Sequence, residues 1–78
     1  MDTDKYRDCF IELGLNIKFY RNKKGLTQEQ LADAVHLSKQ QISRIESPNT
    51  MNSTTLQTLY LIADELDVSI HQLIKSNK

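Results

Sequence analysis

The sequence predicts an all-α protein of five helices in a single domain, and three observations support this. Apolar residues recur at spacings of three and four, which is the period of one face of an α-helix. A hydroxyl residue followed three positions later by glutamine occurs at four candidate helix starts, and this pair satisfies amide groups that a helix start leaves free. No stretch alternates apolar and polar residues as a half-buried strand does.

The first expected helix runs from near Asp4 to Lys24. Its inward residues are Phe10, Leu13, Ile17 and Tyr20. Gly14 interrupts the helix at a cost of about 1 kcal/mol relative to alanine, and either a close helix crossing or a kink explains it. Gly25 then ends the helix in the left-handed conformation that favours glycine.

Two short helices are expected within TQEQLADAVHLSKQQISRIE, residues 27–46. Their starts carry the pairs Thr27 with Gln30 and Ser38 with Gln41. Their inward residues are Leu31 and Val35 in one helix and Ile42 and Ile45 in the other, with Leu37 in the turn. Two capped amphipathic helices this close together form a helix-turn-helix unit, whose second helix is expected at 38–47.

A turn-rich loop, SPNTMNST, leads to the fourth helix, which starts at Ser53, Thr54 or Thr55. Thr54 with Gln57 fits the capping pattern there. The expected inward residues are Leu56, Leu59, Ile62, Ala63 and Leu66. Asp67 ends this helix, because Asp tolerates the left-handed region better than most residues. Ser69 and Gln72 then cap a last short helix with Ile70, Leu73 and Ile74.

The composition argues against several classes of protein. A single cysteine, Cys9, forms no internal disulfide, which fits a reducing cytosol, and we expect it to be buried or half-buried. No apolar run is long enough to span a membrane, and the N-terminus is too polar for a signal peptide. The two histidines, His36 and His71, have no metal-ligand spacing. We therefore expect a cytoplasmic protein that is not an enzyme and needs no metal, cofactor or small-molecule ligand.

The net charge is zero, but its distribution is uneven. Residues 18–44 hold six basic and two acidic residues, a net +4, whereas the rest of the chain is −4. Nucleic-acid binding needs one positive face rather than a positive total. The positive segment coincides with the predicted helix-turn-helix.

Polar side chains remain outside once Ile42 and Ile45 of the second short helix turn inward. They are Lys39, Gln40, Ser43 and Arg44. Lysine and arginine pair with guanine edges and glutamine with adenine, and such a helix enters the major groove of DNA. The second short helix is therefore a candidate for reading bases.

The chain resembles the phage Cro/repressor family, also called XRE-like regulators, from about residue 13 to residue 73. TQEQLA, SKQQISRIE and LIADELDVS carry this resemblance. It implies a five-helix lambda-repressor-like DNA-binding domain over residues 1–78, in which residues 1–12 extend the first helix. It also implies a sequence-specific transcriptional regulator that binds double-stranded DNA, is associated with the nucleoid and acts as a repressor.

The resemblance also assigns roles to residues. By resemblance, Lys39, Gln40 and Arg44 face bases, Gln28 and Ser38 hold phosphates, and Ser43 does either. Arg21 pairs with Glu46 and reaches a phosphate, and Asn49 is a further phosphate contact. His36 stands where the family's turn usually has glycine, so a positive φ is expected there.

Two questions stay open at the level of sequence. The same fold can instead serve as a protein-interaction module, such as an antitoxin or anti-regulator, and an apolar or acidic reading helix would favour that alternative. We also expect a homodimer on a palindromic site, since one reading helix touches few base pairs. Ile70, Ile74 and Tyr60 are candidates for its interface, although Ile70 and Ile74 equally suit the core, and the residues before Leu13 are a rival surface.

Overall fold

The computed structural model describes residues 3–47 and 54–74, with side chains from Asp8 onward. Its helices are α1 (Thr3–Lys24), α2 (Gln28–Ala34), α3 (Lys39–Glu46), α4 (Leu56–Glu65) and α5 (Ile70–Ile74). The described ranges contain no strand, so the predicted all-α fold of five helices is confirmed. None of the described helices is both long enough and apolar enough to cross a membrane.

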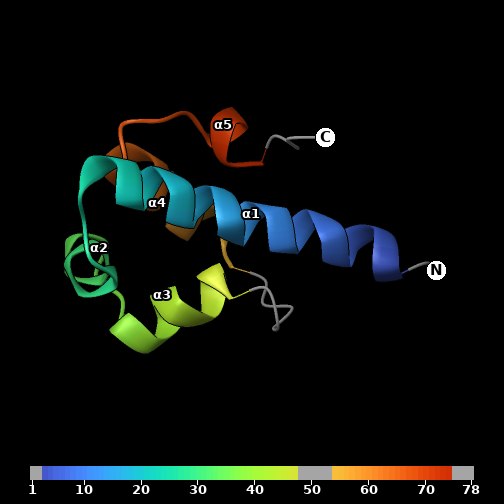
Figure 1. Cartoon of the computed structure of the whole chain (residues 1–78), viewed down its shortest axis with the longest axis horizontal. Coiled ribbons are helices and arrows are strands. Elements are labelled where there is room, and N and C mark those ends of the chain that lie inside the picture. Colours follow the sequence, from blue (N-terminus) through green and yellow to red (C-terminus); the bar gives the residue numbers. More distant parts are fainter. Residues whose placement is uncertain (1–2, 48–53, 75–78) are drawn as a thin grey trace.

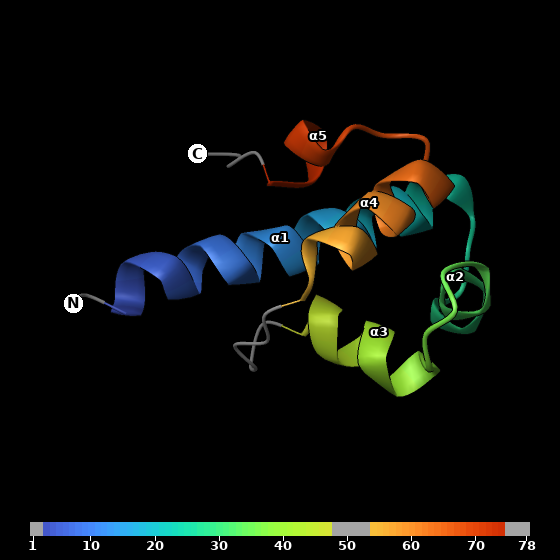
Figure 2. The same ribbon diagram turned by 180° about the vertical axis from the view of Figure 1, so that it is seen from behind.

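The long helix α1 runs through the middle of the molecule (Figures 1 and 2). In both views α5 lies on one side of α1 and α3 on the other, while α2 packs near the C-terminal end of α1. Gly25 has a φ of 79° and ends α1 as predicted. The turn that follows is closed by Leu26 N, which donates to Arg21 O at 3.0 Å.

The core collects apolar side chains from all five helices. Its buried members are Leu13, Ile17, Leu31, Ala32, Val35, Ile42, Ile62, Ala63, Leu66 and Leu73. Most of the inward faces predicted from helical spacing are therefore confirmed. Tyr20, Leu37 and Ile45 are partly buried and pack against this core.

Two predicted burials are wrong. Leu56 is 62% exposed, because it lies six residues before Ile62 and so about 120° away around the helix. Cys9 is also exposed. It lies in the N-terminal part of α1, before the first core residue, Leu13.

Three of the four predicted capping boxes form. Thr27 with Gln30, Ser38 with Gln41, and Ser69 with Gln72 each exchange two hydrogen bonds of 2.8–3.1 Å. The fourth, Thr54 with Gln57, is wrong, because α4 begins one residue later. Thr55 caps it instead, and its hydroxyl accepts from Thr58 N at 3.2 Å.

Two residues with a Cβ adopt the left-handed conformation at turns, as predicted. His36 has a φ of 61° between α2 and α3, and Asp67 has a φ of 58° after α4. Both conformations let the chain close the helix end, since Leu37 N donates to Ala32 O and Val68 N donates to Ala63 O. Both side chains are exposed, so His36 acts in the structure as a turn residue.

Gly14 marks the closest approach of α1 to α3. A Cβ built at this position would lie 2.3 Å from Ile45 O and 3.2 Å from Glu46 Cα. A Cβ atom does not lie 2.3 Å from a carbonyl oxygen in a folded protein, so a side chain at this position would force the backbone of α1 or α3 to shift. Of the two explanations for this glycine, the structure therefore supports the close helix crossing.

Gly14→Ala is expected to lower the free energy of unfolding by about 1–3 kcal/mol, because the new methyl group overpacks the crossing. Helix propensity alone predicts the opposite, a gain of about 1 kcal/mol. Urea denaturation measures the difference, with Asn22→Ala on the exposed side of α1 as the control. A stabilised Gly14→Ala variant would contradict the close crossing.

Candidate nucleic-acid interface

Helix α3 turns its apolar side inward and its polar side to solvent. Ile42 is fully buried, and Ile45 packs partly against the core. Lys39, Gln40, Ser43 and Arg44 are all exposed. The structure therefore presents the four side chains that the sequence singles out on this helix.

Most of the predicted contact residues line one open hollow, of about 460 Å³, between α2 and α3. Its lining residues are Gln28, Lys39, Gln40, Ser43, Arg44 and Ser47. Five of these six were predicted from the sequence as DNA contacts. Ser47 was missed, although it follows Ser43 by four residues and so continues the same side of the helix.

The remaining predicted residues lie elsewhere. Ser38 is exposed at the start of α3, where its hydroxyl caps the helix. Arg21 is only 7% exposed and lies beneath the surface. Asn49 lies outside the described residues.

A buried ion pair ties α1 to the end of α3. Arg21 Nε donates to Glu46 Oε2 at 2.7 Å, and Arg21 Nη2 donates to Glu46 Oε1 at 3.1 Å. The two side chains are 9% and 3% exposed. The pair predicted from the family resemblance therefore forms, in the two-pronged geometry that suits a guanidinium and a carboxylate.

The same pair also fixes α2. Arg21 Nη1 donates to Leu26 O at 2.7 Å, at the entry to α2. Gln28 Nε2 donates to Glu46 Oε1 at 3.2 Å. Helices α1, α2 and α3 are thus connected through one carboxylate and one guanidinium, next to the hollow.

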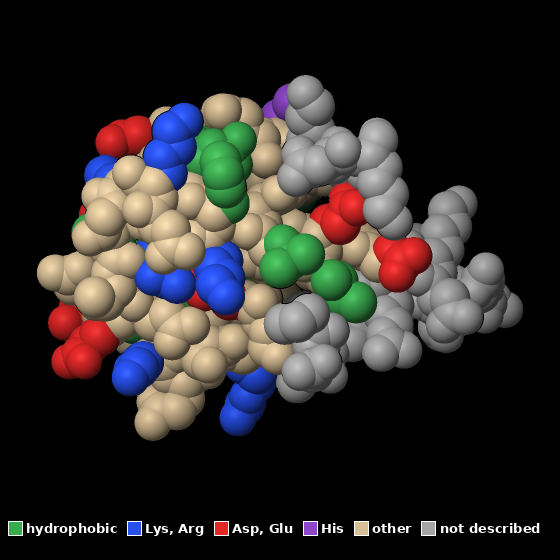
Figure 3. Space-filling model, in the orientation of Figure 1, with side chains coloured by type: hydrophobic (Ala, Val, Ile, Leu, Met, Phe, Trp, Pro, Cys, Tyr) green, Lys and Arg blue, Asp and Glu red, His purple; other side chains and the backbone are tan. Residues whose placement is uncertain are grey.

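The charge on the exposed side of α3 is positive. The single carboxylate of the helix, Glu46, is buried against Arg21, which leaves Lys39 and Arg44 as the exposed charges of α3. Figure 3 shows basic side chains at the edge of the molecule formed by α3. Lys24 lies apart, and its hydrogen bond to Asp67 raises the pKa of the amine.

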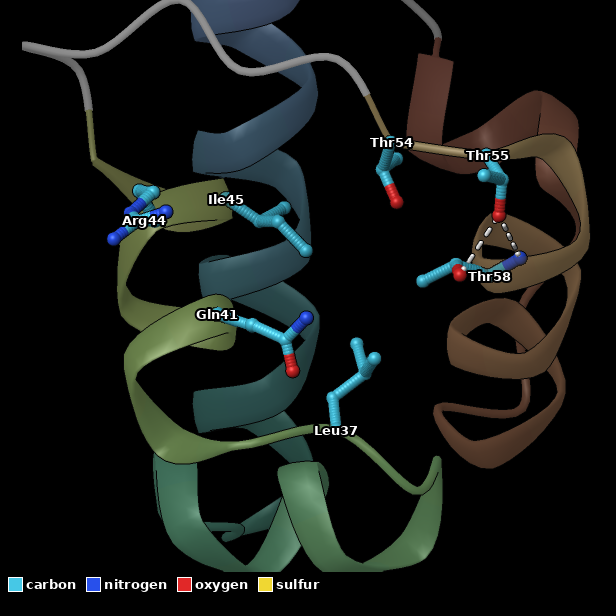
Figure 4. A pocket seen from close by; sticks show the side chains of 7 residues that line it. All are labelled: Leu37, Gln41, Arg44, Ile45, Thr54, Thr55 and Thr58. Atoms are coloured by element: carbon cyan, nitrogen blue, oxygen red, sulfur yellow. Dashed lines mark hydrogen bonds between the residues drawn. The ribbon is translucent and has the colours of Figure 1, made fainter.

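A second hollow, of about 260 Å³, lies between α3 and α4. It is lined by Leu37, Gln41, Arg44, Ile45, Thr54, Thr55 and Thr58. Figure 4 shows Leu37, Gln41 and Ile45 pointing toward α4, while Arg44 lies on the other side of α3. Arg44 is therefore oriented away from α4.

The described residues contain no group of three or more His, Cys, Asp or Glu side chains that could hold a metal ion. His36 and His71 lie on separate elements and are exposed. What the hollow beside α3 offers is a concentration of hydrogen-bond donors and positive charge. Such a surface recognises a ligand rich in acceptors.

Comparison with known proteins identifies the family. Residues 17–73 match the family model described as helix-turn-helix. The control protein C.SmaI of Serratia marcescens is 34% identical over 70 residues, which cover 85% of this chain and 81% of the relative. The chain belongs to this helix-turn-helix family, of the Cro/repressor-like (XRE-like) type that the sequence predicts. Because the family is not enzymatic, the chain is not expected to catalyse a reaction.

Two further relatives are longer proteins. The competence pilus inhibition repressor of Acinetobacter baylyi is 35% identical over 81% of this chain and 56% of its own length. The transcriptional regulator SinR of Bacillus subtilis is 36% identical over 80% of this chain and 55% of its own length. The chain thus spans little more than half the length of these two relatives.

Solved structures share the fold. A crystal structure of SinR in complex with DNA superposes with a TM-score of 0.74 at 35% identity, covering 81% of this chain and 98% of that chain. The restriction-modification controller protein C.AhdI from Aeromonas hydrophila gives a TM-score of 0.75 at 25% identity, with 82% and 94% covered. The five helices therefore have the lambda-repressor-like arrangement predicted from the sequence.

A double-mutant cycle of Arg21→Ala and Glu46→Ala is expected to give a coupling energy of about 2–3 kcal/mol in the free energy of unfolding. Each single change leaves a buried charge without its partner, and the double change removes both. Chemical denaturation of the four proteins measures the coupling. The exposed pair Lys24–Asp67 is the control and is expected to couple far less. Equal coupling in the two cycles would contradict the role given to the buried pair.

Proposed function

We propose that this chain is a sequence-specific DNA-binding transcriptional regulator, acting as a repressor, that reads the major groove with α3. One observation carries the proposal. The exposed side of α3 is basic and rich in amide and hydroxyl groups, while its single carboxylate is buried. A protein-interaction module, the alternative function, would favour an apolar or acidic surface here.

Three side chains are proposed to read bases: Lys39, Gln40 and Arg44. All three line the hollow beside α3. Arginine and lysine donate to the O6 and N7 acceptors of guanine, and glutamine both donates to and accepts from adenine. Ser43 lies among them and can donate either to a base or to a phosphate.

Gln28 and Ser38 are proposed to hold the DNA backbone. One N–H of the Gln28 amide is directed to Glu46, and the second remains to donate to a phosphate oxygen. Ser38 lies at the start of α3, next to Lys39. The proposed backbone contact at Asn49 rests on the family resemblance alone.

Arg21 is proposed to act through its neighbours. Its guanidinium is buried and donates to Glu46 and to Leu26 O. Burial leaves it less suited to direct phosphate contact than the sequence suggested. We therefore propose that Arg21 positions Gln28 and the end of α3, and that a direct contact is secondary.

The relatives support this function. SinR has been crystallised in complex with DNA, and its DNA-bound chain is covered almost completely by the present one. The relative from Acinetobacter baylyi is a repressor. Both resemblances include the helix-turn-helix and α3.

We further propose that the protein binds DNA as a two-fold dimer on a nearly palindromic site. The candidate interface includes Ile74 and Tyr60, which are 56% and 58% exposed. Ile70 packs partly against the core, so its contribution would be smaller. Helix α5 lies on the other side of α1 from α3 (Figure 1), so contacts through α5 leave the reading helix accessible.

Replacing Arg44 or Gln40 with alanine is expected to weaken binding to the preferred duplex by about 1–3 kcal/mol and to relax its sequence preference. Fluorescence anisotropy on the preferred duplex and on single-base variants measures both effects. Lys23→Ala is the control, because it removes an exposed charge outside the hollow. This change is expected to weaken binding to all duplexes by a similar factor, or to leave binding unchanged. If Arg44→Ala left both affinity and preference unchanged, α3 would not be the reading helix.

Dimer formation is expected to appear as two protein copies per palindromic duplex at saturation. Sedimentation equilibrium with and without the duplex measures this stoichiometry. Ile74→Ser is expected to shift binding toward one copy per duplex, whereas Leu56→Ser, another exposed apolar position, serves as the control. One copy per duplex for the unchanged protein would contradict the dimer.

A further inference from the structure

The structure joins α3 and α5 mainly through α1. Helix α5 packs chiefly against α1 and less against α4, whereas α3 packs against α1 and α2. In Figures 1 and 2, α3 and α5 lie on opposite sides of α1. The position of the proposed reading helix relative to α5 is therefore set by how each of the two is held on α1.

A buried amide on α1 holds the end of α5. Asn16 Nδ2 donates to Leu73 O at 2.8 Å. Asn16 is only 5% exposed, and Leu73 is fully buried. Leu73 O is one of the last four carbonyl groups of α5, which have no donor within their own helix. Since a buried amide costs free energy unless it is hydrogen-bonded, this contact satisfies a polar group of each helix.

Helix α5 depends on such contacts for its position. It has only five residues, and an isolated helix this short is not stable in water. Its apolar contacts come from Leu73, which is buried, and from Ile70, which packs partly against the core. Apolar burial is non-directional, so it holds α5 on α1 without defining how α5 is rotated there. The hydrogen bond from Asn16 requires alignment of donor and acceptor, and a single buried asparagine can define the register of two packed helices.

We propose that Asn16 is a positioning residue, which sets the distance between the two reading helices of the dimer and hence the half-site spacing that the protein prefers. The inference rests on the proposed dimer, because the exposed Ile74 of α5 belongs to the candidate interface. Arg21 and Glu46 define the position of α3 on α1, and Asn16 does the same for α5. In a two-fold dimer, a shift of α5 on α1 moves both reading helices relative to the axis, which changes the separation of the half-sites.

The alternative is that Asn16 only stabilises the fold. The two roles differ in what a substitution changes. Lost stability lowers the folded fraction and weakens binding to every duplex by the same factor. Lost positioning leaves binding to a single half-site unchanged, and alters the preference between duplexes whose half-sites are differently spaced.

Three duplexes separate these roles: the preferred palindrome, the same palindrome with two base pairs inserted at its centre, and a single half-site. The insertion moves one half-site by roughly 7 Å and turns it by roughly 70°. The unchanged protein is expected to prefer the first duplex to the second. Asn16→Leu, which has a similar volume but no donor, is expected to reduce this preference roughly fivefold, the factor that one hydrogen bond typically contributes. Its affinity for the single half-site is expected to stay unchanged.

Asn22→Leu is the matched control, because it makes the same change at an exposed position of α1. It is expected to retain the full spacing preference. Circular dichroism establishes that each variant is folded, and Asn16→Ala provides a second variant that leaves space instead of filling it.

Distances between two spin labels test the positioning itself, without DNA. In a Cys9→Ser background, Ser43→Cys and His71→Cys place labels on α3 and α5, at two exposed positions. Electron paramagnetic resonance then measures the distribution of distances between the labels. Asn16→Leu is expected to broaden or shift this distribution, and Asn22→Leu is expected to leave it unchanged.

An unchanged distance distribution, or an unchanged spacing preference, in a folded Asn16→Leu variant would overturn the proposal. Failure of both Asn16 variants to fold would overturn it as well, because the residue would then serve stability. If the unchanged protein does not distinguish the two palindromes, the dimer is wrong and this inference fails with it. Base reading by α3 is tested separately, by the effect of Arg44→Ala on the single half-site.

Discussion

The buried pair of Arg21 and Glu46 is the interaction on which the arrangement of the helix-turn-helix depends. Through it, α1 contacts the entry to α2, the first residue of α2 and the last residue of α3. Removing two charges from water is expensive, and an apolar replacement of similar volume often gives equal or greater stability. Stability alone therefore does not explain this pair. Its hydrogen bonds are directional, so they define how α2 and α3 lie relative to α1. An apolar contact has no such directionality and would not define the arrangement.

The exposed side of α3, which carries Lys39, Gln40, Ser43 and Arg44, needs such support because its own side chains do not anchor the helix to the core. Its side chains are exposed and polar, so they add little to the core, and α3 has only eight residues. Ile42 anchors the helix in the core, and Gly14 allows its last turn to approach α1 closely. The burial of Glu46 also removes the single negative charge of α3 from the surface. One ion pair thus orients the helix and leaves its exposed side positive.

Local patterns in the sequence were sufficient to predict most of this structure. Capping boxes and helix-ending residues are short-range features, so the roles of Ser38 and Asp67 follow from their neighbours, whereas the positive φ of His36 was expected from the family resemblance. The predictions were wrong where the start of a helix could fall on either of two residues, or where the burial of a side chain depends on residues distant in the sequence. Two adjacent threonines, Thr54 and Thr55, compete to start α4. Leu56 is exposed because it lies about 120° around α4 from Ile62, and Cys9 is exposed because the core begins only at Leu13.

In the candidate nucleic-acid interface, too, features set by local spacing were predictable and features set by tertiary packing were not. Spacing along α3 predicted which side chains face solvent, because a helix with a buried apolar side must expose the opposite one. Burial of Arg21 was not predictable, since it results from the packing of three helices around one carboxylate. Ser47 was missed although it ends the helix expected at 38–47 and follows Ser43 by four residues, a spacing that places both on the same side. The family resemblance assigned roles to these residues, but their contacts with DNA are proposals that the structure supports only through position and charge.

Selection of bound fragments from random duplex DNA tests the central claim most directly, because it asks whether this surface distinguishes one sequence from another. A two-fold dimer that reads bases with α3 is expected to enrich a short motif arranged as an inverted repeat, with its two halves about one turn of DNA, roughly 34 Å, apart. Recovery of fragments with no common sequence, at an affinity equal to that for the starting pool, would contradict it.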